Sequence, residues 1–247
     1  LPCPKPKPLC CPPCPPAKTD QKRSLVSALG LDAFILFKQR KMVIFFVFAM
    51  LLGAALQITN AFGGAFLDDF KTIYPNTFGV KHPNILISIS QISETLFILT
   101  IPLFLQRFGI KKVMLMSIFA WVFRFGLFGV GNPGSGLYLL ILSMIIYGMA
   151  FDFFNISGSL FVETTTSPKI RSSAQGLFMM VTNGVGAFLG ATISGIVIGK
   201  YFTMADKTKD WHGIWLYFAI YALVIAVLFG IFFKHKHDPD AIKEVQH

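Results

Sequence analysis

Charged residues are scarce in this chain. They make up 14% of its 247 residues, whereas a soluble globular domain carries about 25%. Hydrophobic residues reach 54%, and most of the 27 phenylalanines lie in long runs separated by short polar loops. Membrane-spanning helices distribute their apolar side chains in this way. The composition therefore excludes a soluble fold and favours a polytopic membrane protein.

Cysteine is absent after residue 14. The cysteines are Cys3, Cys10, Cys11 and Cys14, in a segment where eight of the first sixteen residues are proline. Cys11 and Cys14 have the spacing of a zinc or redox pair, but no histidine or acidic ligand accompanies them. Proline-rich sequence favours an extended polyproline II linker. We therefore expect no metal site here.

A secretory signal is also missing. The sequence begins at Leu1 without an initiator methionine, and its first residues include no short apolar stretch. We expect a piece of a longer protein, in which residues 1–23 form a linker. The formal net charge of +10 would suggest nucleic acid binding in a soluble protein, but the basic residues cluster at the ends of apolar runs. We therefore expect no nucleic acid partner.

Six apolar windows of about 20 residues, the length that crosses a bilayer, follow one another along the chain. They predict an all-α bundle of six transmembrane helices at 42–233. The windows are 42–66, 84–104, 113–130, 136–162, 174–198 and 213–233. Before them, the segment 24–37 is apolar on much of its circumference and too short to cross, so residues 24–41 predict an interfacial helix and its basic boundary. Residues 234–247 form a tail.

Basic residues give the predicted orientation, because loops rich in Lys and Arg stay on the cytoplasmic side. One set of loops and ends carries Lys38, Arg40, Lys41, Arg107, Lys111, Lys112, Lys169, Arg171, Lys234 and Lys236. The opposite loops hold fewer basic residues, and several of these are offset by aspartates. We therefore expect both ends in the cytoplasm. Trp211 and Trp215 are expected in an aromatic belt on the outer side.

Two carboxylates interrupt the apolar windows. Glu94 lies near the middle of the second window, and Asp152 lies in the fourth. A charge near the bilayer centre costs at least about 2.5 to 3.5 kcal/mol, so such residues normally face the interior of a bundle or a wet cavity. A carboxylate among apolar residues is also a candidate proton carrier near neutral pH.

Polar residues in the windows recur in pairs spaced i, i+3. The pairs are Gln57 with Asn60, Gln91 with Glu94, and Asp152 with Asn155. Positions three apart share one helix face, so each helix presents one polar patch, and the three patches could converge on one cavity. Amides supply the donors and acceptors that recognise sugar hydroxyls or a base edge. Phe151 shares a face with the last pair and could stack on a flat ring.

Packing explanations compete with this interpretation. A single amide in a membrane helix is more often a contact between helices than a ligand site. Two acids and four amides with one repeated spacing nevertheless favour a binding cavity. Arg124 either pairs with a carboxylate across the bundle or extends along its own helix. Gly186-x-x-x-Gly190 predicts close helix packing, and the last window lacks acidic, basic and amide side chains, which predicts a lipid-exposed peripheral helix.

The turn after the second window resembles the loop motif of the major facilitator superfamily, Arg-x-Gly-x-Lys-Lys, with Gln106 where the motif usually has Asp. A closer resemblance, over about residues 25 to 236, is to the nucleoside:proton symporters of that superfamily, bacterial carriers of nucleosides and xanthosine. The matching stretches are GLDAFILFK (30–38), FAMLLGAALQITNAFGG (48–64), SISQISETLFILTIPLFLQRFGIKK (88–112), FDFFNISGSLFVE (151–163) and SPKIRSSAQG (167–176).

This resemblance implies that the six spans are helices seven to twelve of a major facilitator fold in the bacterial inner membrane. It implies proton-coupled nucleoside import, for purines or pyrimidines, with the proton as coupling ion and no other cofactor. The implied substrate residues are Gln57, Asn60, Gln91, Glu94, Phe151, Asp152 and Asn155. Glu94 and Asp152 are implied to couple the proton. The amino-terminal six helices are missing, so the site is expected to be one half of a midplane cavity.

Two other classes of protein, an intramembrane protease and a membrane receptor or scaffold, are alternatives to a carrier. An intramembrane aspartyl protease also uses two acids, but it needs Gly-x-Gly-Asp, and Asp152 follows Met149-Ala150-Phe151. The chain is therefore not expected to be an enzyme. The second alternative is a non-transporting membrane receptor or scaffold, which would bind ligand without flux.

Overall fold

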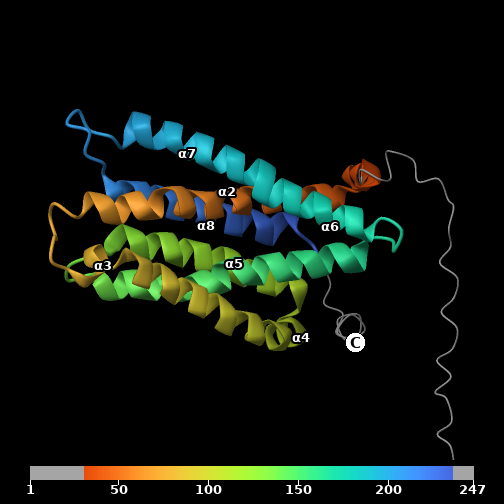
Figure 1. Ribbon diagram of the computed structural model, residues 1–247. Coiled ribbons are helices and arrows are strands. Elements are labelled where there is room, and N and C mark those ends of the chain that lie inside the picture. Colours follow the sequence, from red (N-terminus) through yellow and green to blue (C-terminus); the bar gives the residue numbers. More distant parts are fainter. Residues whose placement is uncertain (1–30, 236–247) are drawn as a thin grey trace, which may run out of the picture.

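A computed structural model of the protein describes residues 31–235, in which long helices lie side by side (Figure 1). The elements are the 3-10 helix η1 (Leu31–Lys38), α2 (Arg40–Asp69), α3 (Phe78–Lys81), α4 (Pro83–Val130), α5 (Leu137–Thr165), α6 (Arg171–Met179), the π-helix η2 (Met180–Gly186), α7 (Ala187–Tyr201) and α8 (Trp211–Phe232). One isolated antiparallel bridge joins Thr203 and Lys209. The described part is therefore all-α, as predicted.

Helix α4 crosses the bundle twice. It has 48 residues, but Gly109 interrupts it with a φ of 77° and a ψ of 164°, a conformation that glycine adopts without the penalty of a Cβ. Ser93 donates to the carbonyl of Ile145, and Arg124 donates to the carbonyl of Ser143 at 2.8 Å. A straight helix would hold these two donors about 46 Å apart. The chain thus makes six passes, because α4 folds back at Gly109.

The segment before α2 is helical where it is described. In η1, Leu36 is buried, whereas Phe34 and Ile35 are 47% and 55% exposed. An apolar outer face on a helix too short to cross suits a position at a membrane interface. The first part of the predicted interfacial helix, residues 24–30, lies outside the described residues. So do the linker with its four cysteines and most of the tail.

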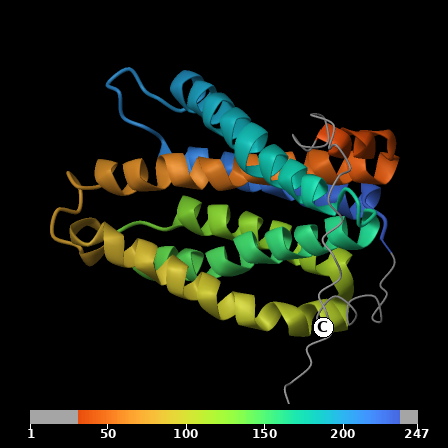
Figure 2. The same ribbon diagram turned by 45° about the vertical axis from the view of Figure 1, so that its right-hand side comes forward.

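Glycines bring the fifth pass against α2. A Cβ on Gly186 would lie 2.5 Å from the carbonyl oxygen of Met50, and one on Gly190 would lie 2.6 Å from the Cα of Ala54. The close packing predicted from these two glycines is confirmed. Beyond this contact α7 leans away from the bundle (Figure 2). The π-helix between α6 and α7 was not predicted from the sequence.

An aromatic cluster fills the bundle where α2 ends and α8 begins. The ring of Phe66 makes edge contacts with Phe128 and Trp211 at 5.5 Å between centroids, and with Trp215 at 5.8 Å. Trp211 is 6% exposed and Trp215 is 0% exposed. The prediction that these tryptophans form an outer aromatic belt is therefore wrong, because the neighbouring rings draw both of them into the core.

Helix α8 is peripheral, as its lack of charged and amide side chains predicts. Its outer side chains are at least half exposed, with Ile220 at 62%, Val224 at 50%, Val227 at 52% and Ile231 at 60%. Its opposite face buries aromatic and small residues against the rest of the bundle, Phe229 among them. In a membrane the outer face of α8 would contact lipid.

The glycine contact with α2 predicts the effect of one added methyl group. Gly190→Ala should lower the unfolding midpoint in detergent, because its methyl would overlap the backbone of Ala54, and overpacking costs about 1–3 kcal/mol. Gly195→Ala is the matched control, since a Cβ there meets nothing within 4 Å. Equal midpoints for the two variants would contradict this packing.

Candidate functional site

Polar side chains from α2 and from both halves of α4 meet at a cavity of about 170 Å³. Asn60 and Gln91, two of the predicted site residues, both line it, beside Thr59, Arg124 and Tyr147. Its remaining walls are mostly apolar or glycine, including Gly63 and Gly64 from α2, Leu67, Phe128 and Met144. A few polar groups in an apolar wall are typical of a site that orients a small molecule.

The other predicted residues do not line this cavity. Phe151 and Asn155 line a narrow second cavity against α2 and η2. Gln57 is half-buried on α2, one turn before Asn60, and lines neither of these two cavities. The structure therefore brings Asn60 and Gln91 to one cavity and Phe151 and Asn155 to another, and Gln57, Glu94 and Asp152 line neither.

Arg124 is held inside the bundle. Its side chain is 4% exposed, its Nη1 donates to the carbonyl of Ser143 at 2.8 Å, and its guanidinium carbon lies 4.3 Å from the ring centroid of Tyr147. Its Nε has no hydrogen-bond partner among the described residues. Arg124 thus turns toward α5 and not along its own helix, but no ion pair joins it to a carboxylate among the described residues.

Tyr147 connects the two cavities. It lines the larger one, and its ring stacks on Phe151, which lines the smaller one, at 6.0 Å between centroids and 5° between planes. Sequence reasoning missed Tyr147. The available signal was its position four residues before Phe151, because residues spaced i, i+4 share a helix face.

The two acids lie on neighbouring passes, Glu94 in the first half of α4 and Asp152 in α5. Asp152 is 6% exposed, and its Oδ2 has no hydrogen-bond partner among the described residues. Glu94 is half-buried. Gly148 brings the two helices together here, since a Cβ on it would lie 2.7 Å from the backbone nitrogen of Glu94. An ionised buried carboxylate without a partner is costly, so a proton on Asp152 would remove a penalty.

Asn155 adds a further unsatisfied group beside the acids. Its Nδ2 donates to the carbonyl of Phe151 at 3.2 Å, but its Oδ1 is buried without a partner among the described residues. The hydroxyl of Thr59, which lines the larger cavity, is also buried without a hydrogen-bond partner among the described residues. Buried polar atoms normally find a partner, so these two are available to a bound molecule or water.

Six apolar passes with a polar-lined cavity, one buried acid and one half-buried acid are typical of one half of a multi-pass secondary transporter. The chain belongs to the nucleoside H⁺ symporter family, whose family model matches residues 8–238. It is 58% identical to the xanthosine permease of Escherichia coli K12 over 232 residues, 93% of this chain and 55% of the permease. It is 54% identical to the nucleoside permease NupG of the same organism over 238 residues, 94% of this chain and 56% of NupG.

Solved structures agree with this assignment. The chain is similar to a crystal structure of the nucleoside transporter NupG, with a TM-score of 0.78 and 57% identity over 87% of this chain and 54% of that one. A point mutant of NupG gives a TM-score of 0.82 and 56% identity over 89% of this chain and 55% of that one. The chain spans about half the length of the relatives it matches and has half of a major facilitator fold.

The contacts of Arg124 predict a graded loss of stability. Arg124→Gln should lower the free energy of unfolding by about 1–3 kcal/mol, because it removes a buried hydrogen bond and the cation over the ring of Tyr147. The free energy of unfolding of Arg124→Lys should lie between those of Arg124→Gln and the wild type, because lysine keeps the charge but cannot stack as a planar group. Thermal unfolding in detergent checks the order. A wild-type midpoint for Arg124→Gln would contradict the described contacts.

Proposed function

We propose that this chain is the carboxy-terminal half of a carrier that imports nucleosides, purine or pyrimidine, together with protons. Membership of the nucleoside H⁺ symporter family supports this proposal. The observation that carries it is the cavity in which Asn60 and Gln91 meet beside Arg124 and Tyr147. Its volume of about 170 Å³ is less than the roughly 300 Å³ of a complete small-molecule pocket, which suits half of a site.

The proposed substrate contacts follow the chemistry of each side chain. Amides donate and accept at the same time, so they suit the hydroxyls of a ribose and the edge of a base. The ring of Phe151, already stacked on Tyr147, suits the face of a base. The proposed substrate residues are Gln57, Asn60, Gln91, Glu94, Phe151, Asp152 and Asn155.

Proton coupling is assigned to Glu94 and Asp152. In the outward-facing state, a proton on either acid would lower the cost of closing the site around a substrate, because it removes a buried charge. Nucleoside would then bind through the amides and Phe151. Rocking of one half against the other would open the site inward and release both. The proton is the coupling ion, no other cofactor takes part, and no bond in the substrate is broken, so the protein is not an enzyme.

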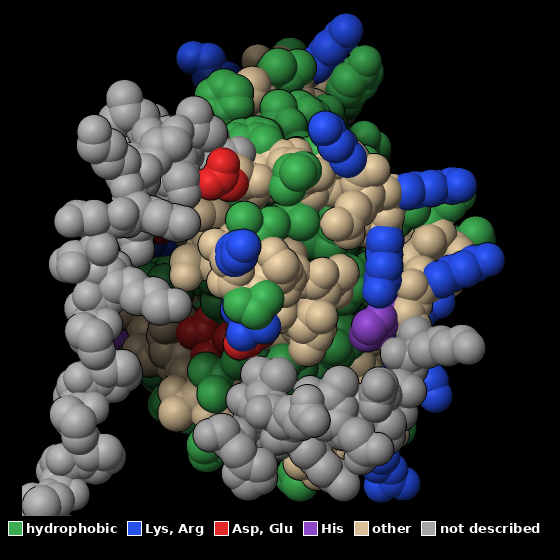
Figure 3. All heavy atoms as spheres, turned by 90° about the vertical axis from the view of Figure 1, so that its right-hand side faces the viewer, with side chains coloured by type: hydrophobic (Ala, Val, Ile, Leu, Met, Phe, Trp, Pro, Cys, Tyr) green, Lys and Arg blue, Asp and Glu red, His purple; other side chains and the backbone are tan. Residues whose placement is uncertain are grey.

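The carrier needs a second six-helix half. Secondary transporters bind substrate at the midplane between repeats and move one repeat against the other. The amino-terminal half would supply the rest of the pocket, so this chain alone would not transport. We place the carrier in the bacterial inner membrane. Lys and Arg side chains gather at the end where α2 begins (Figure 3), which supports a cytoplasmic position for both ends of the chain.

Asp152→Asn in the full-length carrier should abolish nucleoside accumulation driven by a pH gradient while leaving exchange between equal nucleoside pools. The amide keeps the shape of the side chain but cannot take up a proton. Uptake into proteoliposomes with and without a gradient checks this. Unchanged accumulation under a pH gradient would show that Asp152 does not couple the proton.

Asp206→Asn is the matched control. Asp206 lies in the loop between α7 and α8, where the hydroxyl and backbone N–H of Thr208 donate to its carboxylate at 2.7 and 3.0 Å. These hydrogen bonds hold the pKa of Asp206 below its usual value. The group therefore stays ionised in the tested pH range, and its replacement should leave gradient-driven uptake intact.

Asn60→Ala and Gln91→Ala should each raise the KM for nucleoside about tenfold, because each removes a hydrogen bond to substrate and leaves its partner unsatisfied. Asn84→Ala is the control, since Asn84 is exposed near the start of α4 and does not line the cavity. Initial rates of uptake over a range of substrate concentrations give the comparison. Wild-type KM values for both cavity variants would remove these amides from the site.

A further inference from the structure

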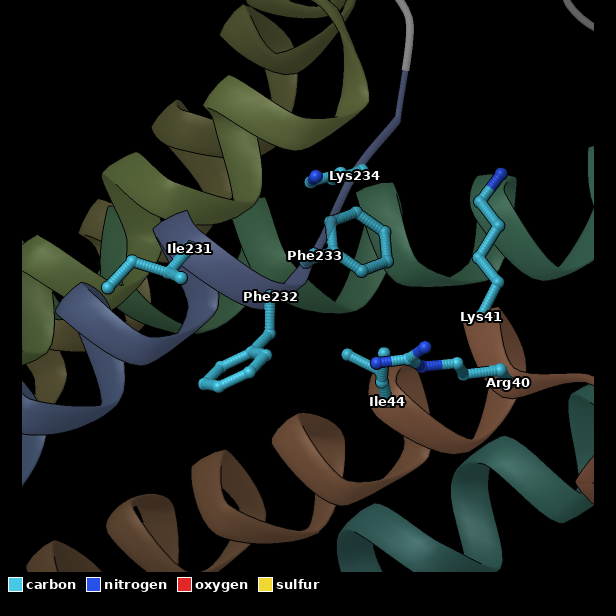
Figure 4. Close-up of a pocket in the computed structure, with 7 residues that line it drawn as sticks. All are labelled: Arg40, Lys41, Ile44, Ile231, Phe232, Phe233 and Lys234. Atoms are coloured by element: carbon cyan, nitrogen blue, oxygen red, sulfur yellow. The ribbon is translucent and has the colours of Figure 1, made fainter.

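A hollow separate from both of these cavities lies between the start of α2 and the end of α8, at one end of the bundle. It measures about 550 Å³ and shares no lining residue with the candidate substrate cavity. Its lining residues are Arg40, Lys41, Ile44, Ile231, Phe232, Phe233 and Lys234. The lining residues come from the start of α2, the end of α8 and the two residues that follow it (Figure 4). Nothing in the proposed transport cycle uses this hollow.

The lining combines cations with an apolar wall. Three of the seven residues are basic and none is acidic. Lys41 is the most constrained cation, because its Nζ lies 3.1 Å from Nδ1 of His235 and 4.9 Å from the ring centroid of Phe161. Arg40 and Lys234 are exposed and can turn toward a ligand. Basic side chains beside an apolar wall would bind a ligand that has a negatively charged head group and an apolar body.

The hollow lies where the apolar part of the bundle ends. The membrane-spanning stretch of α2 starts at Arg40, and that of α8 stops at Phe232. Several Lys and Arg side chains project from this end of the molecule (Figure 3). Ile231 and Phe232, in the last turn of α8, are 60% and 52% exposed. They continue the lipid-facing surface of α8 up to the hollow. A ligand here would have its head at the level of the membrane surface and its body beside the helices.

We propose that this hollow binds an anionic phospholipid. The phosphate lies among Arg40, Lys41 and Lys234, and an acyl chain runs along Ile44, Ile231 and Phe232. Clustered basic residues at the end of a membrane helix attract anionic lipid headgroups with about 1 kcal/mol each. A free phosphate would satisfy the cations but leave the apolar wall uncovered, so the lipid is the better match to the whole lining.

The test uses the full-length carrier in mixed micelles of phosphatidylglycerol and phosphatidylcholine, with bound lipid counted by native mass spectrometry. The wild type should retain phosphatidylglycerol preferentially. The double variant Arg40→Gln/Lys234→Gln should bind it about 25-fold more weakly, since each cation contributes about fivefold. Glycerophosphoglycerol, the same headgroup without acyl chains, and inorganic phosphate should not displace the lipid.

Lys112→Gln/Lys169→Gln is the matched control. Lys112 lies in α4 shortly after Gly109, Lys169 lies in the turn between α5 and α6, and both are exposed and do not line the hollow. This double variant removes the same charge and should retain the lipid. Equal losses in the two double variants would overturn the proposal in favour of unspecific surface charge. Displacement by phosphate alone would overturn it in favour of an anion site. Absence of bound lipid in the wild type would also overturn the proposal. Unfolding midpoints confirm that each variant is folded.

Discussion

A polar group that leaves water for the interior of a membrane must be satisfied within the protein, and this requirement organises the bundle. Arg124 meets it through the carbonyl of Ser143 and the ring of Tyr147. Ser93 and Ser117 meet it by donating across the helix interface to carbonyls of α5. The same α5 therefore receives hydrogen bonds from both halves of α4, and it fixes the distance between the two halves.

Small residues set how closely the helices approach at the level of the site. A Cβ on Gly53 would overlap the carbonyl of Thr182, and one on Gly148 would overlap the backbone beside Glu94. These contacts bring α2 against η2 and α5 against α4. Without the apolar driving force available in water, membrane helices depend on such packing. The glycines therefore set the distance of α2 from η2 and of α5 from the first half of α4.

The outer surface serves a different purpose from the interior. Apolar side chains on α8 face outward along most of its length, and the basic residue Lys234 follows shortly after the helix ends. The hollow lined by Arg40, Lys41 and Lys234 lies at this transition. One pattern of charge can therefore serve both the orientation of the chain and the binding of lipid, because both depend on the attraction of cations to an anionic membrane surface.

Much of the fold could be predicted from the sequence, because apolar runs of about 20 residues must cross a bilayer as helices. All six predicted windows correspond to passes, and the turn between the second and third was recognised from the segment that contains Gly109. The prediction that Trp211 and Trp215 form an outer aromatic belt was wrong, because composition does not say which face of a helix packs against other aromatic rings. The π-helix η2 was missed for a similar reason, because it depends on packing against α2.

The candidate site divides in the same way. The sequence by itself determined which residues are too costly to place in lipid, namely Glu94, Asp152 and their amide neighbours, because the cost of burying a polar group belongs to the residue. Only the tertiary structure decided which of these groups meet. It placed Asn60 and Gln91 in the lining of one cavity with Arg124 and Tyr147, and it left Gln57 one turn of α2 away from Asn60. That choice depends on helix approach and rotation, which are set by contacts between residues far apart in the chain.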